Sequence, residues 1–327
     1  MRRRDFITLL GGAAASWPQA ARAQEARVRR IGWLGTPKDH PYGIGSIAAF
    51  RRGLADLGWL ESRNFVIEQR GLSGDADQNT RDAQELVALA PDVLVGDGGA
   101  AVMRFLAFTR TIPIVFAHVN DPIARGFVAS LARPGGNVTG FTYLEYETTA
   151  KWPLLLKQIA PQLTQVAVMG NFSGIDGKSQ LTPIQAAAPS LGVAVRILEV
   201  TTATEIERGM AEIARASNVG LIVTANVETL FDYKLIVALA ARYRLPAIYF
   251  QRFFVVEGGL ISYAPDDSTS WRAAAGYIDR IFKGAKPGEL PVQQPAKFEL
   301  LINLKTAKAI GLDISPALLS VADELLE

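Results

Sequence analysis

From residue 27 onward, short and almost wholly apolar runs alternate with amphipathic segments, and this alternation restricts the folds open to the chain. Between the runs "VRRIGWLG", "PDVLVG" and "IPIVFA", apolar residues recur every three to four positions, as on one face of a helix. Strands that alternate with helices predict βαβ units and a parallel sheet. Because the runs are apolar throughout, we expect helices on both faces of that sheet.

The same order of runs is found twice. Three runs of the first half correspond in order to three of the second: "RIGWLGT" (30–36) to "QVAVMGN" (165–171), "PDVLVGDG" (91–98) to "VGLIVTAN" (219–226), and "IPIVFAH" (112–118) to "LPAIYFQ" (245–251). We therefore predict an α/β fold of two doubly wound parallel-sheet lobes joined by a hinge. In such sheets a ligand lies beyond the carboxyl ends of the strands, which here places it in a cleft between the lobes.

The N-terminus has the features of an export signal. Residues 1–23 begin with three arginines, continue with a short apolar stretch and end in Ala21-Arg22-Ala23. Arg3-Arg4-Asp5-Phe6-Ile7 looks like the twin-arginine motif that exports folded proteins. The apolar stretch is shorter than the roughly 20 residues that span a bilayer, so we expect cleavage after Ala23 and a soluble periplasmic protein.

Charge and cysteine content exclude several classes of function. The signal carries four arginines against one aspartate, so its removal changes the net charge of +2 by −3, to −1. That value gives no case for a nucleic-acid partner. The chain has no cysteine, which removes disulfides, thiolate catalysis and zinc–thiolate sites, and its two histidines are too few for a metal site. We expect neither a metal nor a cofactor.

The first half offers a glycine-rich turn as a candidate site. Residues 96–101, "GDGGAA", fit the dinucleotide pattern G-x-G-x-x-A. They follow the third strand of their half rather than the first, and no clear acidic partner ends the next strand, so a nicotinamide site is weakly indicated. We favour a turn at a helix start, where Gly98, Gly99 and Ala100 offer backbone N–H groups to an anionic end of a ligand.

His118 leaves two functions open. In "IPIVFAHVNDP" an apolar run ends in His118, Asn120 and Asp121, at the expected edge of the sheet. An exported α/β enzyme, a nicotinamide oxidoreductase or a hydrolase, would use His118 and Asp121, with His118 as base. The chain lacks the G-x-S-x-G nucleophile elbow of many hydrolases. We favour a hydrogen-bonding residue in the wall of the cleft.

Several acidic and hydroxyl residues are predicted to begin helices. Asp121 with Pro122 has the composition of an N-cap and first helical residue, and Thr204 with Glu207 has the spacing of a capping box. The carboxylate pair Asp266 and Asp267 resembles a glycosidase pair, but caps and solvated loops explain it more simply.

The second half supplies the opposite wall of the predicted cleft. Candidate residues at its strand ends are Asn171, Phe172, Ser173, Asn226, Gln251 and Arg252. Arg252 could bind a carboxylate through two parallel hydrogen bonds, or it could lie on the surface. Aromatic residues near the expected rim could sandwich a flat ligand: Tyr42, Phe172, Phe253 and Tyr263. Core packing is at least as likely for Phe253 and Phe254.

Two stretches indicate a known family: "TIPIVFAHVNDPIARGFVASLARPGGNVTGFTYLE" (111–145) and "KFELLINLKTAKAIGLDISPALLSVADELLE" (297–327). They resemble the bacterial ABC-transporter substrate-binding proteins of the type I periplasmic class, in the subfamily that includes binders of tryptophan and other aromatic amino acids. The resemblance runs from about residue 28 to the end of the chain. It implies a two-lobed venus-flytrap fold, a ligand held between the lobes, and delivery to a membrane permease driven by an ATPase.

The resemblance also implies positions for the site. The family's contacts would fall on Thr36 to Tyr42, Gly98 to Ala100, Asn120 and Asp121, Asn171 to Ser173, Asn226, Gln251 and Arg252. Many relatives have a smaller residue in place of His118, and "GDGGA" replaces their more usual Gly-Thr-Pro-Ala. These departures leave the identity of the solute open.

Together these features predict the periplasmic solute-binding component of an ABC importer. We expect a monomer that captures a small organic solute, an amino acid or aromatic acid, without chemical change. A transcription regulator with the same core is disfavoured, because an export signal stands where a helix-turn-helix would be. The expected parts are a first lobe (27–144 plus about 264–285), a second lobe (145–263 plus about 286–310) and a C-terminal helical tail (311–327).

Overall fold

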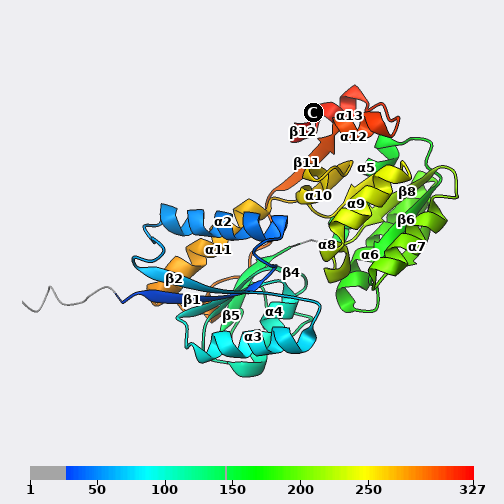
Figure 1. Cartoon of the computed structure of the whole chain (residues 1–327). Helices are drawn as coiled ribbons and strands as arrows, with labels where there is room; N and C mark the ends of the chain where they lie inside the picture. Colours follow the sequence, from blue (N-terminus) through cyan, green and yellow to red (C-terminus); the bar gives the residue numbers. More distant parts are fainter. Residues whose placement is uncertain (1–26, 144–145) are drawn as a thin grey trace, which may run out of the picture.

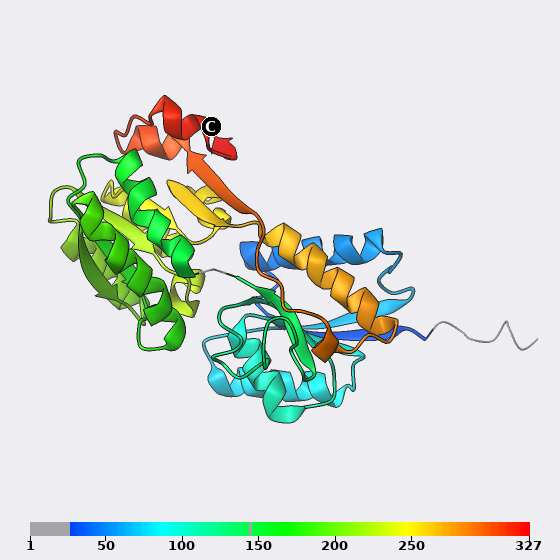
Figure 2. The same cartoon turned by 180° about the vertical axis from the view of Figure 1, so that it is seen from behind.

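The computed structural model describes residues 27–143 and 146–327, which form two α/β lobes (Figure 1). In each lobe helices cover both faces of a sheet, as Figures 1 and 2 show from opposite sides. The export signal predicted for residues 1–23 and the hinge crossing predicted near residue 144 lie outside the described residues. Within the described part of the chain, no helix is both long and apolar enough to cross a membrane.

The first lobe contains a parallel sheet of five strands in the order β2-β1-β3-β4-β5. Its strands are β1 (Arg29–Gly35), β2 (Phe65–Gly71), β3 (Val93–Asp97), β4 (Ile114–Val119) and β5 (Val138–Thr142). Its helices are α2 (Pro41–Asp56), α3 (Ala76–Ala88), α4 (Gly99–Phe108), α11 (Asp267–Phe282) and the short η3 (Pro287–Glu289).

The second lobe contains a sheet of seven strands in the order β12-β11-β10-β9-β8-β6-β7, in which only the β10–β11 pair is antiparallel among the described pairings. Its strands are β6 (Gln165–Gly170), β7 (Ala194–Glu199), β8 (Val219–Val223), β9 (Ala247–Tyr249), β10 (Ile261–Pro265), β11 (Phe298–Asn303) and β12 (Glu324–Leu326). Its helices are η1 (Tyr146–Ala150), α5 (Lys151–Ile159), α6 (Ile175–Ala187), η2 (Ala188–Leu191), α7 (Ala203–Ile213), α8 (Val227–Phe231), α9 (Tyr233–Arg242), α10 (Arg252–Val256), α12 (Leu304–Ala309) and α13 (Pro316–Ser320).

The first lobe has a separate apolar core on each face of its sheet. On one face of the first sheet, Trp33 of β1 packs against Trp271 of α11 at a ring-centroid distance of 4.5 Å. On the other face, Phe105 of α4 and Phe116 of β4 belong to a second buried cluster. Each fully buried side chain of this size contributes about 1.5–3 kcal/mol through removal from water. The alternating sequence pattern therefore produced covered sheets, as predicted.

The chain returns to the first lobe close to the expected residue and leaves it again later than expected. β10 of the second lobe ends at Pro265, and α11 then packs against α2 on the first lobe. Residues up to 293 remain there, because Gln293 N donates to Gly140 O at 3.0 Å. The boundary expected at about 264 thus falls near 266, and the one expected at about 286 falls just before β11. The tail expected to be helical contains α13 but ends in β12, which extends the second sheet.

Two predicted helix starts were wrong. The N-cap of α7 is Thr202, whose hydroxyl accepts from Glu205 N at 3.3 Å, instead of the predicted Thr204 with Glu207. Both pairs have the spacing of a capping box, and where the helix begins decides between them. Asp121 begins a turn and no helix: its Oδ1 accepts from Ala124 N at 2.9 Å, and its φ is 42°.

A substitution at Gly140 tests how closely β4 and β5 approach each other. A Cβ at this position would lie 2.1 Å from the carbonyl oxygen of Phe116, so we expect Gly140→Ala to lower the free energy of unfolding by about 1–3 kcal/mol. Gly136→Ala is the control, because its Cβ would meet no atom within 4 Å. Urea unfolding of the two variants measures the difference, and equal stability would contradict the close approach.

Candidate functional site

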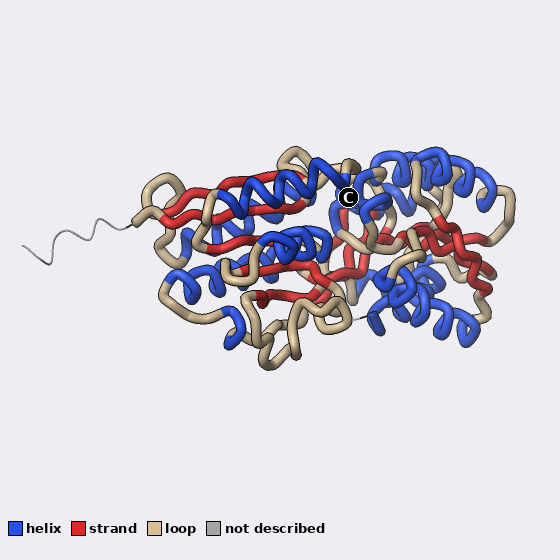
Figure 3. Tube along the Cα trace, turned by 90° about the horizontal axis from the view of Figure 1, so that it is seen from below, coloured by secondary structure: helices blue, strands red, loops and turns tan. Residues whose placement is uncertain are grey.

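The carboxyl ends of the parallel strands of the two sheets face each other. In Figure 3 the strands of both lobes run toward the junction between them. Residues that follow strand ends make direct contacts across this junction: His40 with Leu230, Arg125 with Asp176, and Tyr143 with Phe250. The junction therefore joins the two edges at which the sequence predicted a ligand site.

A polar cluster, defined here as Tyr42, Asp97, His118 and Asp267, lies on the first-lobe side of the junction. Oδ1 of Asp97, at the end of β3, accepts from the Tyr42 hydroxyl at 3.2 Å and lies 3.2 Å from Nδ1 of His118. Nδ1 of His118 is 2.5 Å from the Tyr42 hydroxyl. Thr36 N and Oγ1 donate to the other Asp97 oxygen at 3.2 and 2.9 Å. Asp97 thus holds three strand-end segments together.

The His118 ring lies between two carboxylates. On its other side, Nε2 of His118 forms an ion pair with Oδ1 of Asp267 at 2.9 Å. Burial alone would lower the pKa of His118, but the Asp267 and Asp97 carboxylates outweigh it and raise the pKa to about 9. His118 is therefore an imidazolium at neutral pH. Burial raises the pKa of Tyr42 well above its usual value, so its hydroxyl stays protonated.

The backbone of β4 aims His118 into this position. His118 has a φ of 59°, in the left-handed region, and the β4–β5 register shifts between Phe116 and Val119. A shift of this kind re-aims a side chain at a sheet edge. The His118 ring then meets Tyr143 and Trp271 edge-on, with centroids 5.2 Å away in both cases.

His40 carries a second interaction across the junction. Its Nδ1 caps α2 by accepting from Tyr42 N at 3.2 Å, which requires Nδ1 to be unprotonated. Its Nε2 then donates to Leu230 O of the second lobe at 3.1 Å. The ring packs against Tyr233 and Phe253 with centroids 5.1 and 5.3 Å away. Burial lowers the pKa of His40, which favours the neutral form that the cap on Tyr42 N needs. The bond to Leu230 O is made by the neutral and the protonated ring alike, because both carry a proton on Nε2.

The N-terminus of α4, predicted to bind an anion through Gly98, Gly99 and Ala100, lies against Arg125. Gly98 is the N-cap with a φ of 86°, and a Cβ on Gly99 would lie 3.1 Å from the Arg125 guanidinium carbon. Arg125 Nε donates to Asn120 O at 3.1 Å, and its guanidinium pairs with Asp176 of the second lobe. The Arg125 guanidinium and the N-terminus of α4 therefore lie side by side at the junction.

The second-lobe candidates form turns and caps at their strand ends. Asn171 Oδ1 accepts from Ser173 N at 3.1 Å, and Asn171 Nδ2 donates to Glu228 at 3.0 Å. Asn226 caps α8 by accepting from Thr229 N at 3.0 Å. Phe172 and Gln251 are buried. These residues fix the shape of the second-lobe edge.

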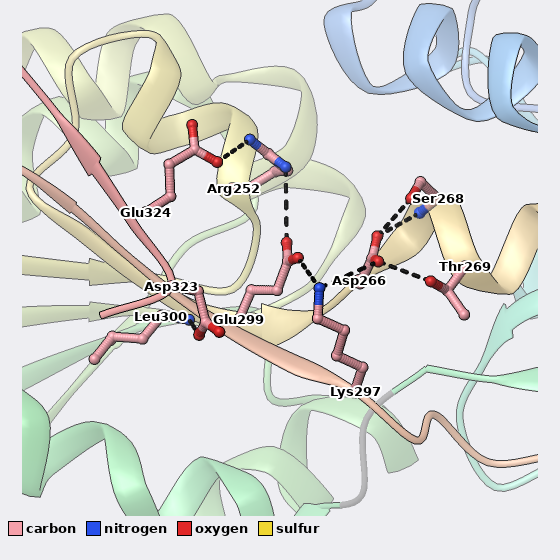
Figure 4. A network of polar contacts seen from close by, with 9 residues as sticks. All are labelled: Arg252, Asp266, Ser268, Thr269, Lys297, Glu299, Leu300, Asp323 and Glu324. Carbon is pink, nitrogen blue, oxygen red and sulfur yellow. Dashed lines mark hydrogen bonds and ion pairs between the residues drawn. The ribbon is translucent and has the colours of Figure 1, made fainter. Parts of the chain in front are cut away.

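Arg252 and Tyr263 lie apart from the polar cluster. Arg252 pairs with Glu324 of β12 at 2.8 Å and Glu299 of β11 at 3.7 Å, as Figure 4 shows, so its guanidinium already has two carboxylate partners. The Tyr263 ring stacks on Phe298 with centroids 5.6 Å apart. Both belong to the region where the outer strands of the second sheet meet the hinge.

The predicted residues therefore fall into separate groups. One hydrogen-bonded network contains Thr36, Tyr42 and His118. A second group adjoins Arg125: Gly98, Gly99, Ala100 and Asn120. The opposite edge is shaped by Asn171, Phe172, Ser173, Asn226 and Gln251, and outside these groups lie Asp121, Arg252 and Tyr263. The sequence reasoning missed Asp97, Arg125 and Trp271 as site residues. His40 fell within the range Thr36 to Tyr42 but was not chosen by itself, and Asp267 was considered and assigned to a cap or loop. Asp97 immediately precedes a chosen glycine, which was a usable signal.

A surface pocket of about 420 Å³ lies at the far end of the second lobe. Its walls come from α12, α13 and the loop between them, and none of the predicted site residues lines it. It is therefore separate from the junction between the lobes.

Comparisons with known proteins agree with this architecture. A family model described as ABC transporter substrate binding protein matches residues 39–326. The Tyrosine-binding protein of Clostridioides difficile (strain R20291) is 24% identical over 275 residues, which cover 84% of this chain and 79% of that protein. An ABC domain from Streptococcus pneumonia in complex with L-Trp has a TM-score of 0.82 at 24% identity, covering 91% of this chain and 100% of its own. The ligand-free, open structure of a substrate-binding protein with adhesive properties from Clostridium difficile has a TM-score of 0.68 at 21% identity, covering 92% and 99%.

The raised pKa of His118 predicts a loss of stability at alkaline pH. Stability from its ion pairs is fully present below the unfolded pKa of 6.5 and is lost as pH rises through about 9, a change of roughly 3 kcal/mol. Urea unfolding between pH 6.5 and 9.5 measures it. His118→Asn, which tolerates a left-handed φ and does not titrate, is expected to lose this part of the pH dependence. An unchanged dependence would contradict the charged state.

The lowered pKa of His40 predicts a loss of stability in acid. Neutral His40 caps α2 through Nδ1 above pH 6.5, and this cap is lost as pH falls through the lowered pKa, because the added proton occupies Nδ1. Since a lost N-cap costs about 0.5–2 kcal/mol, we expect urea unfolding to show a decrease of this size between pH 7.5 and 5. His40→Asn is the matched control, because its amide oxygen can cap without titrating. The same decrease in this variant would show that another group causes it.

Proposed function

The chain belongs to the family of ABC transporter substrate-binding proteins, and we propose that it binds an amino acid with an aromatic side chain between its lobes. One observation carries the proposal: the carboxyl edges of both sheets meet at a junction that combines buried charged groups with aromatic rings from both lobes. Charged groups suit the polar end of an amino acid, and rings suit an aromatic side chain.

The aromatic contacts support a ligand with a ring. Tyr42 of the first lobe lies 6.3 Å from Phe253 of the second between ring centroids, and His40 packs edge-on against Tyr233 and Phe253. Aromatic pairs in edge or offset arrangements gain about 0.5–1.5 kcal/mol beyond their buried area, so these rings favour a ligand that brings a further ring. The relatives described as binding tyrosine or holding L-Trp favour the same class of ligand.

The contacts between the lobes support capture by closure. Arg125–Asp176 and His40–Leu230 join the lobes directly. A ligand that contacts both edges adds to these interactions only in the closed state, and this difference in affinity drives closure.

Catalysis by His118 is less well supported. A general base needs an unprotonated nitrogen near neutral pH, whereas two carboxylates raise the pKa of His118 to about 9. Asp121, its proposed partner in an enzyme, is exposed and caps a turn through Ala124 N. Binding without chemical change is therefore the better account of this cluster.

We place this binding role outside the cytoplasm. The sequence of residues 1–23 favours export through a twin-arginine signal into the periplasm. There the ligand-bound protein would act as a monomer and deliver the solute to an ABC permease and its ATPase in the inner membrane.

Thermal unfolding against the twenty amino acids and their aromatic derivatives tests the function. We expect L-tyrosine or L-tryptophan to stabilise the protein, by about 2.7 kcal/mol at 100 times the dissociation constant. Mass spectrometry of the released ligand should find it unaltered. The proposal fails if no amino acid shifts the transition, or if incubation converts the ligand into a product.

A further inference from the structure

The polar cluster carries one more negative charge than positive. Asp97 and Asp267 both approach the single imidazolium of His118, at 3.2 and 2.9 Å. In the described part of the chain, neither carboxylate has a lysine or arginine within ion-pair distance. The N-terminus of α11 provides Asp267 with about half a positive charge. A buried charge without a full counter-charge is costly, so the cluster favours a further cation.

Asp267 is the carboxylate with acceptor capacity to spare. Asp97 already accepts hydrogen bonds from Thr36 and Tyr42. Oδ1 of Asp267 pairs with Nε2 of His118 at 2.9 Å, and the Asp267 side chain is 14% exposed, so another group can reach the carboxylate. The His118 side chain is 9% exposed, so the carboxylate is the more accessible half of this ion pair. A carboxylate accepts more than one hydrogen bond, so Asp267 can bind a further donor while it stays paired with His118.

The surroundings favour an organic ammonium group over a metal ion. No group of three or more histidine or acidic side chains in the described residues is arranged to hold a metal. The rings of Tyr143 and Trp271 flank His118, and Trp271 Nε1 lacks a hydrogen-bond partner. Aromatic rings beside a carboxylate stabilise a bound ammonium through cation–π attraction as well as charge.

We propose that Asp267 binds the α-ammonium group of the ligand, while His118 positions the Asp267 carboxylate through the ion pair between Nε2 and Oδ1. The inference rests on the proposed function and narrows it. Free aromatic amino acids and aromatic amines both carry the ammonium group that this subsite binds. Aromatic acids without an amino group leave Asp267 without its counter-charge and are rejected.

Isothermal titration calorimetry with matched ligands tests the subsite in the unaltered protein. The series is L-tyrosine, tyramine and 3-(4-hydroxyphenyl)propanoate, with L-tryptophan, tryptamine and indole-3-propanoate as the second set. Because a hydrogen bond between charged groups is lost, we expect the acids without an amino group to bind at least about tenfold more weakly than the amino acids. Each amine should bind more tightly than the corresponding acid.

Asp267→Asn removes the charge with almost no change in shape. We expect its affinity for the amino acid to fall at least about tenfold, with that for the acid unchanged or improved. Asp266→Asn is the matched control one residue away: Asp266 caps α11 through Ser268 N at 3.0 Å and approaches Lys297 at 3.9 Å. Asparagine is an equally good N-cap, so this control should bind both ligands as the unaltered protein does.

Each outcome has a distinct meaning. If the acids bind the unaltered protein as tightly as the amino acids, or if Asp267→Asn keeps the original preference, the ammonium subsite is wrong and the binding function stands. If none of the six compounds binds, both proposals are wrong. Should Asp267→Asn fail to fold by circular dichroism, the ligand comparison in the unaltered protein still decides.

Discussion

The parallel pairing of strands is the constraint on which the rest of the structure depends. In a parallel sheet every strand ends at the same edge, so loops from distant parts of the chain meet there. Asp97, His118 and Thr36 follow or end three different strands and are joined in one network for this reason. The second lobe repeats the arrangement, and the two edges meet at the junction. Contacts between the lobes, buried charges and aromatic rings therefore accumulate in one place.

The electrostatics of this junction connect binding with closure. His118 is held charged by two carboxylates, whereas His40 is kept neutral by burial among rings of the second lobe. His118 thus forms ion pairs within the first lobe, whereas His40 contacts the second lobe. A ligand that contacts both edges adds free energy only when they meet, so recognition and closure are one equilibrium. The outer network of Arg252, Glu299 and Glu324 lies at the hinge and strengthens the second lobe instead.

The candidate site was predicted in part. Thr36, Tyr42 and His118 could be chosen because strand ends at one edge are recognisable from apolar runs. Asp267 was assigned to a cap because it adjoins Asp266 in sequence, yet only Asp266 caps α11. Arg252 was assigned to the ligand because its position matched a strand end, but two carboxylates of the C-terminal strands occupy its guanidinium. Local sequence predicts turns and caps well, because their partners are near in the chain. It predicts ion pairs between distant segments poorly, because those depend on where later segments pack in the fold.

By itself the sequence determined the two α/β lobes and the edge at which they act, because hydrophobic periodicity fixes which segments become strands and helices. It also determined the family, through the stretches around His118 and at the C-terminus. The return of the segment at about 264–285 to the first lobe was expected from the sequence, but only the tertiary structure decided that α11 brings Asp267 and Trp271 to His118. It likewise decided that the tail ends as β12 in the second sheet. Long-range packing energies select these placements, and no local pattern encodes them.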